Sequence, residues 1–314
     1  MLNLIHVQQF KKFMNSNITL RNFWSNSSIG HENIFHEDFT KMFLLTIVEN
    51  LNLPSNVYID SNFKKKFIFK KISDKFKTIN NLEARQRIAY GYDYELFKKR
   101  DSKYIWYTPE NMRPPLHLNY DVFLSHDLES YGGKNIYLPF WVTRLSKTLT
   151  GAIDFQSNLL NKRNIQSRPR KFACAVISNP DPIRLEFIKL LSNYGKVDIF
   201  GKLGTPIDDK MKILEEYRFN ICFENSLFPG YVTEKSLESW LSGCIPVWHG
   251  LDAGEFLNRK ALINVAELGF QNSIEEIVKL DSEDSDYYSV ANEPFLKKEF
   301  DFKSFSSNLL NLMK

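Results

Sequence analysis

The sequence predicts an α/β protein in which parallel strands alternate with helices. Three short apolar runs in its second half, 171–177, 219–223 and 244–248, are each bounded by turn residues. Runs of this kind are typical of strands that are buried on both faces of a sheet. The stretches between them carry apolar residues at helical spacing. This alternation predicts a doubly wound, parallel sheet.

The boundaries of these elements have local causes. Asp181 can cap a helix that has Pro182 at its first position, because the carboxylate accepts from free backbone N–H groups and proline needs no such bond. Gly243 can end a later helix in the left-handed conformation. The remaining elements expected in this half are a strand at 197–200, helices at 210–217, from Thr233 and at 273–280, and a strand at 261–265.

The first half is also expected to be α/β, but its strand order does not follow from the sequence. The expected elements are a helix at 37–51 and strands at 56–59, 103–107, 120–124 and 136–138. The polar stretch 161–170 is the best linker candidate, and 302–313 has the pattern of an amphipathic helix. We therefore predict an α/β domain at 1–160, a Rossmann-like domain at 161–295, and a C-terminal helical segment at 296–314 that can pack back on the first domain.

Composition limits the function classes. The chain has 314 residues and a net charge of +4, which does not by itself indicate nucleic acid. Cys174, Cys222 and Cys244 lie in apolar runs and lack metal or disulfide spacing, so buried free thiols are expected. No run is long enough to span a bilayer, and the first residues do not resemble a signal peptide. A cytoplasmic protein is expected, and peripheral contact with the inner face of the membrane stays open.

The most informative stretch is 219–250, FNICFENSLFPGYVTEKSLESWLSGCIPVWHG. It predicts a strand, a turn, a helix and a second strand. Asn225, Tyr231, Glu234 and Lys235 fall at the edge where the strands end, which is where α/β sheets bind ligands. A helix start favours an anion, so a diphosphate would suit this place. Taken alone, a Glu-Lys pair is more typical of a solvated first turn than of a binding site.

The ordered pattern FENS…PGYVTEK…GCIPVWHG resembles the donor-binding signature of the α-1,3/1,4-fucosyltransferases, glycosyltransferase family ten. The resemblance covers most of residues 104–270. It is closer to the bacterial members, because the chain shows no N-terminal anchor. It implies a GT-B architecture, in which two Rossmann-like domains face a cleft and the C-terminal domain holds the nucleotide sugar.

The resemblance also implies roles for particular residues. Arg184, in SNPDPIR, corresponds to a phosphate ligand, and Asn225 and Tyr231 belong to the GDP site. Lys235 resembles the lysine that neutralises the diphosphate. Glu234 resembles the carboxylate near the fucose ring, where it could stabilise positive charge in the transition state.

The acceptor side offers Glu110, in YIWYTPENMRPP, on a proline-rich loop after a strand. This loop resembles the family motif that carries the proposed general base, which takes the acceptor hydroxyl proton. Glu129, together with Asp127, is the reserve candidate.

Other polar residues receive structural interpretations. His117 and His126 are expected to be structural histidines, with contact to the acceptor left open, and His249 lies beside the donor site without a catalytic assignment. Asp284 and Asp286 superficially resemble a metal-binding Asp-X-Asp, but they lie in an acidic stretch expected to be a solvated loop. The basic and apolar segment 64–71 reads as an edge strand protected by lysines, with lipid or glycan contact left open.

The leading hypothesis is an inverting transfer of L-fucose from GDP-β-L-fucose to a hydroxyl of an N-acetylglucosamine or glucose residue, which forms an α-1,3 or α-1,4 linkage. The acceptor would be an oligosaccharide such as N-acetyllactosamine or a surface-glycan precursor. No cofactor and no divalent metal are expected, because Lys235, Arg184 and a helix start can balance the diphosphate. The alternatives are a non-catalytic nucleotide-sugar or glycan-binding protein on the same fold, and a transferase with another donor or acceptor.

Overall fold

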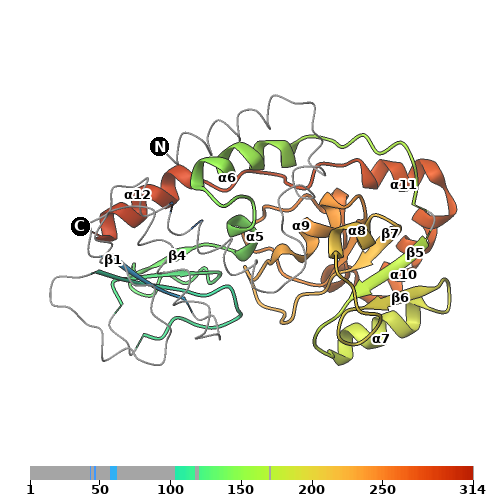
Figure 1. Ribbon diagram of the computed structural model, residues 1–314, viewed down its shortest axis with the longest axis horizontal. Coiled ribbons are helices and arrows are strands. Elements are labelled where there is room, and N and C mark those ends of the chain that lie inside the picture. The colour runs from blue at the N-terminus through green and yellow to red at the C-terminus, as the bar shows by residue number, and fades with distance from the viewer. Residues whose placement is uncertain are drawn as a thin grey trace.

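The computed structural model describes Phe43, Thr46 and residues 57–61, 103–116, 120–169 and 171–313. Its strands form two sheets in which every pairing is parallel (Figure 1). The first sheet has the order β1-β2-β3-β4 and consists of β1 (Val57–Ser61), β2 (Lys103–Tyr107), β3 (Val122–Ser125) and β4 (Asn135–Tyr137). The expected strands of the first half are therefore confirmed, with shifts of one or two residues at some ends.

The second sheet has the order β6-β5-β7-β8-β9, in which the chain winds outward in both directions from β5. Its strands are β5 (Lys171–Val176), β6 (Val197–Phe200), β7 (Tyr217–Ile221), β8 (Ile245–Trp248) and β9 (Ile263–Asn264). The connecting helices are α7 (Pro182–Leu191), α8 (Lys210–Leu214), α9 (Glu234–Leu241) and α10 (Val265–Ser282). The prediction of a doubly wound parallel sheet is confirmed.

Helix caps account for where these helices begin. The Asp181 side chain accepts from the backbone N–H of Arg184, and Pro182 is the first helical residue of α7. Gly243 has φ +92° just after α9, as a left-handed helix end requires. The expected helix 210–217 is wrong at its end, because Tyr217 already pairs in β7 next to β5.

Further helices were not expected from the sequence. They are α5 (Phe140–Thr143), α6 (Leu149–Gln156) and α11 (Asp284–Ala291), together with the 3₁₀ turns Ser157–Leu160 and Arg259–Ala261. The interpretation of residues 284–286 as a loop is therefore wrong. Asp284 and Asp286 lie in the first turn of α11, where acidic residues complement the helix dipole.

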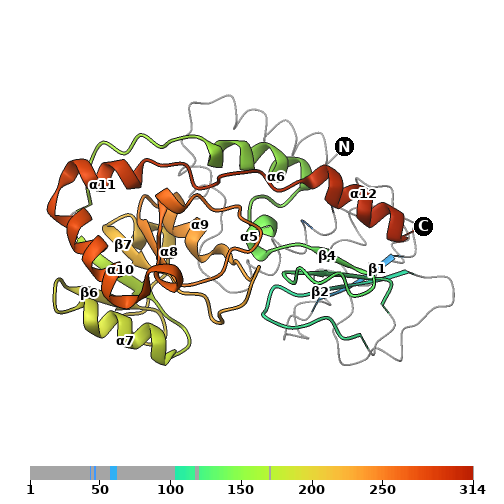
Figure 2. The same cartoon turned by 180° about the vertical axis from the view of Figure 1, so that it is seen from behind.

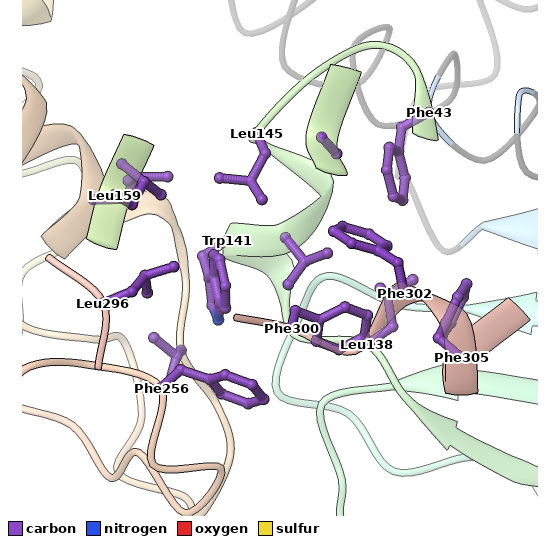
Figure 3. Close-up of a cluster of buried hydrophobic side chains, with 14 of the residues drawn as sticks. Phe43, Leu138, Trp141, Leu145, Leu159, Phe256, Leu296, Phe300, Phe302 and Phe305 are labelled. Atoms are coloured by element: carbon purple, nitrogen blue, oxygen red, sulfur yellow. The ribbon is translucent and has the colours of Figure 1, made fainter. Parts of the chain in front are cut away.

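One of the hydrophobic cores joins the first sheet to parts of the second half (Figure 3). Trp141 of α5 packs against Phe256 with a ring centroid distance of 5.6 Å. Helix α12 (Phe302–Met313) adds Phe302 and Phe305 to the same core and packs against β3 and β4. Figure 2 shows α12 at the end of the molecule that holds the first sheet.

The expected linker is anchored along its described part. Arg163 donates to the backbone carbonyls of Trp240 and Ala291, and its guanidinium lies 4.3 Å from the Trp240 ring centroid. Arg168 forms an ion pair with Asp281 at 2.7 Å. The domain boundary near residue 160 stays a prediction. Within the described part of the chain, none of the helices combines the length and the apolar character that a membrane crossing needs.

Candidate functional site

The site is built around the start of α9. Thr233 is the N-cap, and its hydroxyl accepts from the backbone N–H of Lys235. The helix therefore begins at Glu234, directly after the loop that follows β7. Its free N–H groups lie at the carboxyl edge of the second sheet, as the sequence predicts.

Glu224 is the centre of this site, and the sequence did not assign it a role. Its side chain has no exposed surface (0%). One carboxylate oxygen accepts from the Thr233 backbone N–H at 2.8 Å and from Trp248 Nε1 at 3.1 Å. The other accepts from Thr233 Oγ1 at 2.6 Å and from Lys235 Nζ at 3.1 Å. The position after a buried strand could have signalled it, but nothing in the sequence pairs it with Trp248.

Lys235 lies between this carboxylate and solvent. Its ammonium donates to Glu224 and to Thr233 Oγ1, both at 3.1 Å, and 21% of its side chain is exposed. Burial lowers the pKa of Lys235, but the charges of Glu224 and Glu234 outweigh burial and raise it. The lysine is therefore a cation with a third N–H that these contacts leave unused.

Arg184 belongs to the first turn of α7. Its side chain lies near the end of β7, close to this lysine. It is 4% exposed, and one of its terminal nitrogens donates to the carbonyl of Phe223 at 2.8 Å. Its Nε is buried without a hydrogen-bond partner. Burial lowers the pKa of Arg184, although a guanidinium stays charged in proteins. A buried cation with an unused donor suits an anion.

Asn225 and Tyr231 both lie in the loop between β7 and α9. Asn225 is exposed, whereas Tyr231 is only 3% exposed. Burial raises the pKa of Tyr231, and the charges of Glu224, Glu110 and Glu234 raise it further. The phenol is therefore neutral and can only donate or accept hydrogen bonds.

Glu110, in the loop after β2, and Glu234, at the start of α9, lie near the same two buried tyrosines. The charges of both carboxylates act on the same two buried phenols, Tyr107 at the end of β2 and Tyr231 beside α9. Glu110 itself is exposed, and its backbone N–H donates to Thr108 Oγ1 at 3.2 Å. Glu110 is therefore a solvent-facing carboxylate, and its role as general base stays a prediction.

Three side chains join two loops near Tyr231. We call this group, Arg113, His126 and Phe228, the clasp. The Arg113 guanidinium lies 3.3 Å from the Phe228 ring centroid and donates to His126 Nε2 at 2.8 Å. The His126 ring meets Tyr231 edge to face at 4.9 Å. The clasp connects the loop that bears Glu110 with the loop that bears Tyr231.

The reserve candidates lie differently. Asp127 is buried and accepts from the Tyr131 hydroxyl at 2.5 Å and the Glu129 N–H at 3.0 Å, with Arg113 at 3.4 Å. Its hydrogen bonds and Arg113 lower the pKa of Asp127 despite its desolvation. Glu129 is exposed in the β3–β4 turn. Asp127 therefore serves the fold of this turn.

The other polar residues lie as follows. The His249 ring is half-buried and lies 5.0 Å from the Phe223 ring. Burial lowers the pKa of His249, which agrees with a neutral imidazole beside Arg184. Asp284 pairs with Arg168. A search of the described residues for groups of three or more His, Cys, Asp or Glu that could hold a metal ion finds none. His117 and segment 64–71 lie outside the described residues.

All three cysteines are buried and unbonded, as expected. Burial raises the pKa of the Cys222 thiol to about 12, so this thiol next to Phe223 is not a nucleophile.

Comparisons with known proteins agree with this site. Residues 166–292 match the family model described as glycosyltransferase family 10 (fucosyltransferase), C-terminal part. The chain is 27% identical over 232 residues to the α-(1,3)-fucosyltransferase FucT of Helicobacter pylori, which covers 63% of this chain and 48% of the relative. It is 29% identical over 206 residues to the 3-galactosyl-N-acetylglucosaminide 4-α-L-fucosyltransferase FUT3 of Bos taurus, which covers 60% of this chain and 52% of the relative. The chain thus matches about half the length of these curated relatives.

Solved structures share the fold. A crystal structure of α1,3-fucosyltransferase with GDP superposes with a TM-score of 0.59 at 20% identity, covering 87% of this chain and 96% of that one. A crystal structure of α1,3-fucosyltransferase with GDP-fucose gives a TM-score of 0.58 and covers 88% and 97%. The family match spans β5 to α11 and so includes Arg184, Glu224, Tyr231, Glu234 and Lys235. Residues 166–292 therefore form a domain of the glycosyltransferase family 10 type.

Proposed function

We propose that the protein is an inverting fucosyltransferase of GT-B architecture. It would transfer L-fucose from GDP-β-L-fucose to a hydroxyl of an N-acetylglucosamine or glucose residue in a glycan, with an α-1,3 linkage as the first expectation. The observation that carries this proposal is that Glu110, from the loop after β2, and Glu234, at the start of α9, both lie close enough to Tyr107 and Tyr231 for their charges to act on these phenols.

The donor side has groups suited to a diphosphate. The unused N–H of Lys235, the buried Nε of Arg184 and the helix start of α9 supply positive charge and donors. Tyr231 and Asn225 would contact the nucleotide from the loop between β7 and α9. With these groups balancing the phosphates, the proposal needs no divalent metal.

The chemical step needs two carboxylates in different roles. Glu110 would take the proton of the acceptor hydroxyl as that oxygen attacks the anomeric carbon. Glu234 would lie on the donor side and stabilise positive charge that develops on the sugar ring. Attack from the face opposite the diphosphate inverts the anomeric configuration, from β in the donor to α in the product.

The comparisons support this proposal from two directions. The matched relatives are named as fucosyltransferases that form α-1,3 or 4-linked products. The superposed crystal structures are titled as complexes with GDP and GDP-fucose. Three unpaired, buried thiols suit a reducing compartment, so we propose a cytoplasmic setting.

The test is incubation with GDP-fucose and N-acetyllactosamine or lactose, with GDP-mannose as the alternative donor, followed by NMR of the product. We expect one α-linked fucose on the N-acetylglucosamine or glucose residue and an equal amount of GDP. GDP binding without product from any acceptor would favour the non-catalytic alternative. Product from GDP-mannose alone would assign another donor.

A further inference from the structure

Glu224 lies behind Lys235 as seen from solvent. The carboxylate is fully buried, whereas the lysine retains 21% of its side-chain exposure. Four donors from Thr233, Lys235 and Trp248 occupy the carboxylate oxygens. The carboxylate is therefore fixed and cannot itself contact a substrate that approaches from solvent.

The charges of Glu224, Glu234 and Arg184 all act on Lys235 at the helix start. Lys235 and Arg184 are cations, and Arg184 is held by backbone carbonyls rather than by a carboxylate. Glu224 is the carboxylate that hydrogen-bonds Lys235, at 3.1 Å. It removes one unit of positive charge from the place where a diphosphate would bind.

We propose that Glu224 is a positioning residue that fixes Lys235 at the diphosphate and that its charge favours the release of GDP after transfer. This inference rests on the proposed function. When the bond from the anomeric carbon to the diphosphate oxygen breaks, its electron pair stays on that oxygen. The acceptor oxygen forms the new bond and loses its proton to Glu110. GDP therefore leaves with one more negative charge than the diphosphate had in GDP-fucose.

Because GDP carries one more negative charge than GDP-fucose, a buried negative charge near the phosphates repels GDP more strongly than GDP-fucose. At the short distances of this site and an effective dielectric constant of about 20 to 40, one unit charge changes a binding constant by roughly tenfold or more. Glu224 thereby opposes product inhibition while it holds the lysine that the donor needs.

The experiment compares Glu224→Gln and Glu224→Ala, which remove the charge, with Glu224→Asp, which keeps it. The alanine variant is included because a glutamine amide would place an N–H group opposite the Thr233 and Trp248 donors. The measured quantity is the inhibition constant of GDP divided by the KM of GDP-fucose. We expect this ratio to fall about tenfold in both neutral variants, with lower kcat, and to stay near the wild-type value in Glu224→Asp.

The outcomes separate this inference from the proposed function. A wild-type protein that neither binds GDP nor transfers fucose contradicts the proposed function itself. A wild-type transferase whose neutral variants weaken GDP and GDP-fucose equally, or whose aspartate variant shifts the ratio as they do, overturns the inference alone. Thermal melting of each variant checks the fold, and neutral variants that cannot fold at any temperature would assign Glu224 to the fold and also overturn it.

Discussion

The Tyr137 hydroxyl donates a hydrogen bond to the backbone carbonyl of Gly230 at 3.1 Å, and this bond joins the end of β4 to the loop before α9. Gly230 has φ +83°. A Cβ atom there would lie 2.5 Å from the backbone oxygen of His126. The close approach of the two loops therefore requires a residue without a side chain.

Replacing Gly230 by alanine is expected to separate these loops. The left-handed backbone costs about 1–2 kcal/mol for a residue with a Cβ atom, and the clash with His126 adds to this. We expect a lower melting temperature and weaker GDP binding by calorimetry. Gly132→Ala is the matched control, because Gly132 has φ +70° but no atom within 4 Å of the added Cβ. Equal losses of GDP affinity in both variants would contradict the role given to the close approach.

Glu110→Gln is expected to lower kcat at least about 100-fold, because the amide cannot take the acceptor proton. GDP affinity should stay near the wild-type value, since Glu110 lies across from the diphosphate groups. Glu129→Gln, on the exposed β3–β4 turn, is the control and should keep its turnover. The opposite result, a loss of turnover only in Glu129→Gln, would assign the base to Glu129.

Lys235→Met is expected to weaken GDP binding by at least tenfold, because it removes a cation and leaves the buried Glu224 unpaired. The free energy of unfolding should also fall. Lys189→Met, on the exposed side of α7, removes the same charge from the same half of the chain and should leave GDP affinity unchanged. Isothermal titration measures the GDP affinity of both variants. Unaltered affinity in Lys235→Met would remove this lysine from the diphosphate site.

His126 gives the protein a pH dependence. Burial, followed by the neighbouring Arg113, lowers the pKa of His126 to about 4. A histidine with a lowered folded pKa contributes stability above its unfolded pKa of about 6.5 and loses it as the pH falls towards 4. Between pH 7 and pH 5 the loss from this residue is about 2 kcal/mol.

Urea unfolding at both pH values measures this loss. Asp127 lies close enough to His126 to raise its pKa partly, and the ring also faces Arg113, Phe228 and Tyr231. His126→Phe keeps the ring contacts with Phe228 and Tyr231 but cannot titrate. Its loss between pH 7 and pH 5 should be smaller than that of the wild type by about 2 kcal/mol. Identical losses would mean that other groups cause the dependence.

The second half of the fold could be predicted because its signals are local. Asp181 and Pro182 mark a helix start within two residues, and Gly243 marks an end. The end of the helix after Lys210 was misplaced because the apolar spacing continues through Tyr217, whose place is decided by pairing with β5 rather than by propensity.

The site could be predicted only in part, because some of its contacts join residues that are far apart in the sequence. Glu234 and Lys235 stand together in the sequence and in the structure, and a helix cap explains both. The role of Glu224 was not predicted, because its partner Trp248 lies 24 residues away on another strand. The role of Arg113 was not predicted either, because the ring that it covers, Phe228, belongs to a loop of the other sheet. Such pairs depend on how the sheets pack, which no spacing rule describes.

Helix α12 has a consequence for how the chain is made. Phe302, Phe305 and Leu309 are buried in the core that also holds Phe43 and the strands of the first sheet. These residues leave the ribosome only after the whole second sheet has emerged. The first half of the protein therefore cannot complete its core until α12 has been made, and its apolar surface stays uncovered until then. Holding chaperones should bind nascent chains that lack α12, and should leave once this helix has docked.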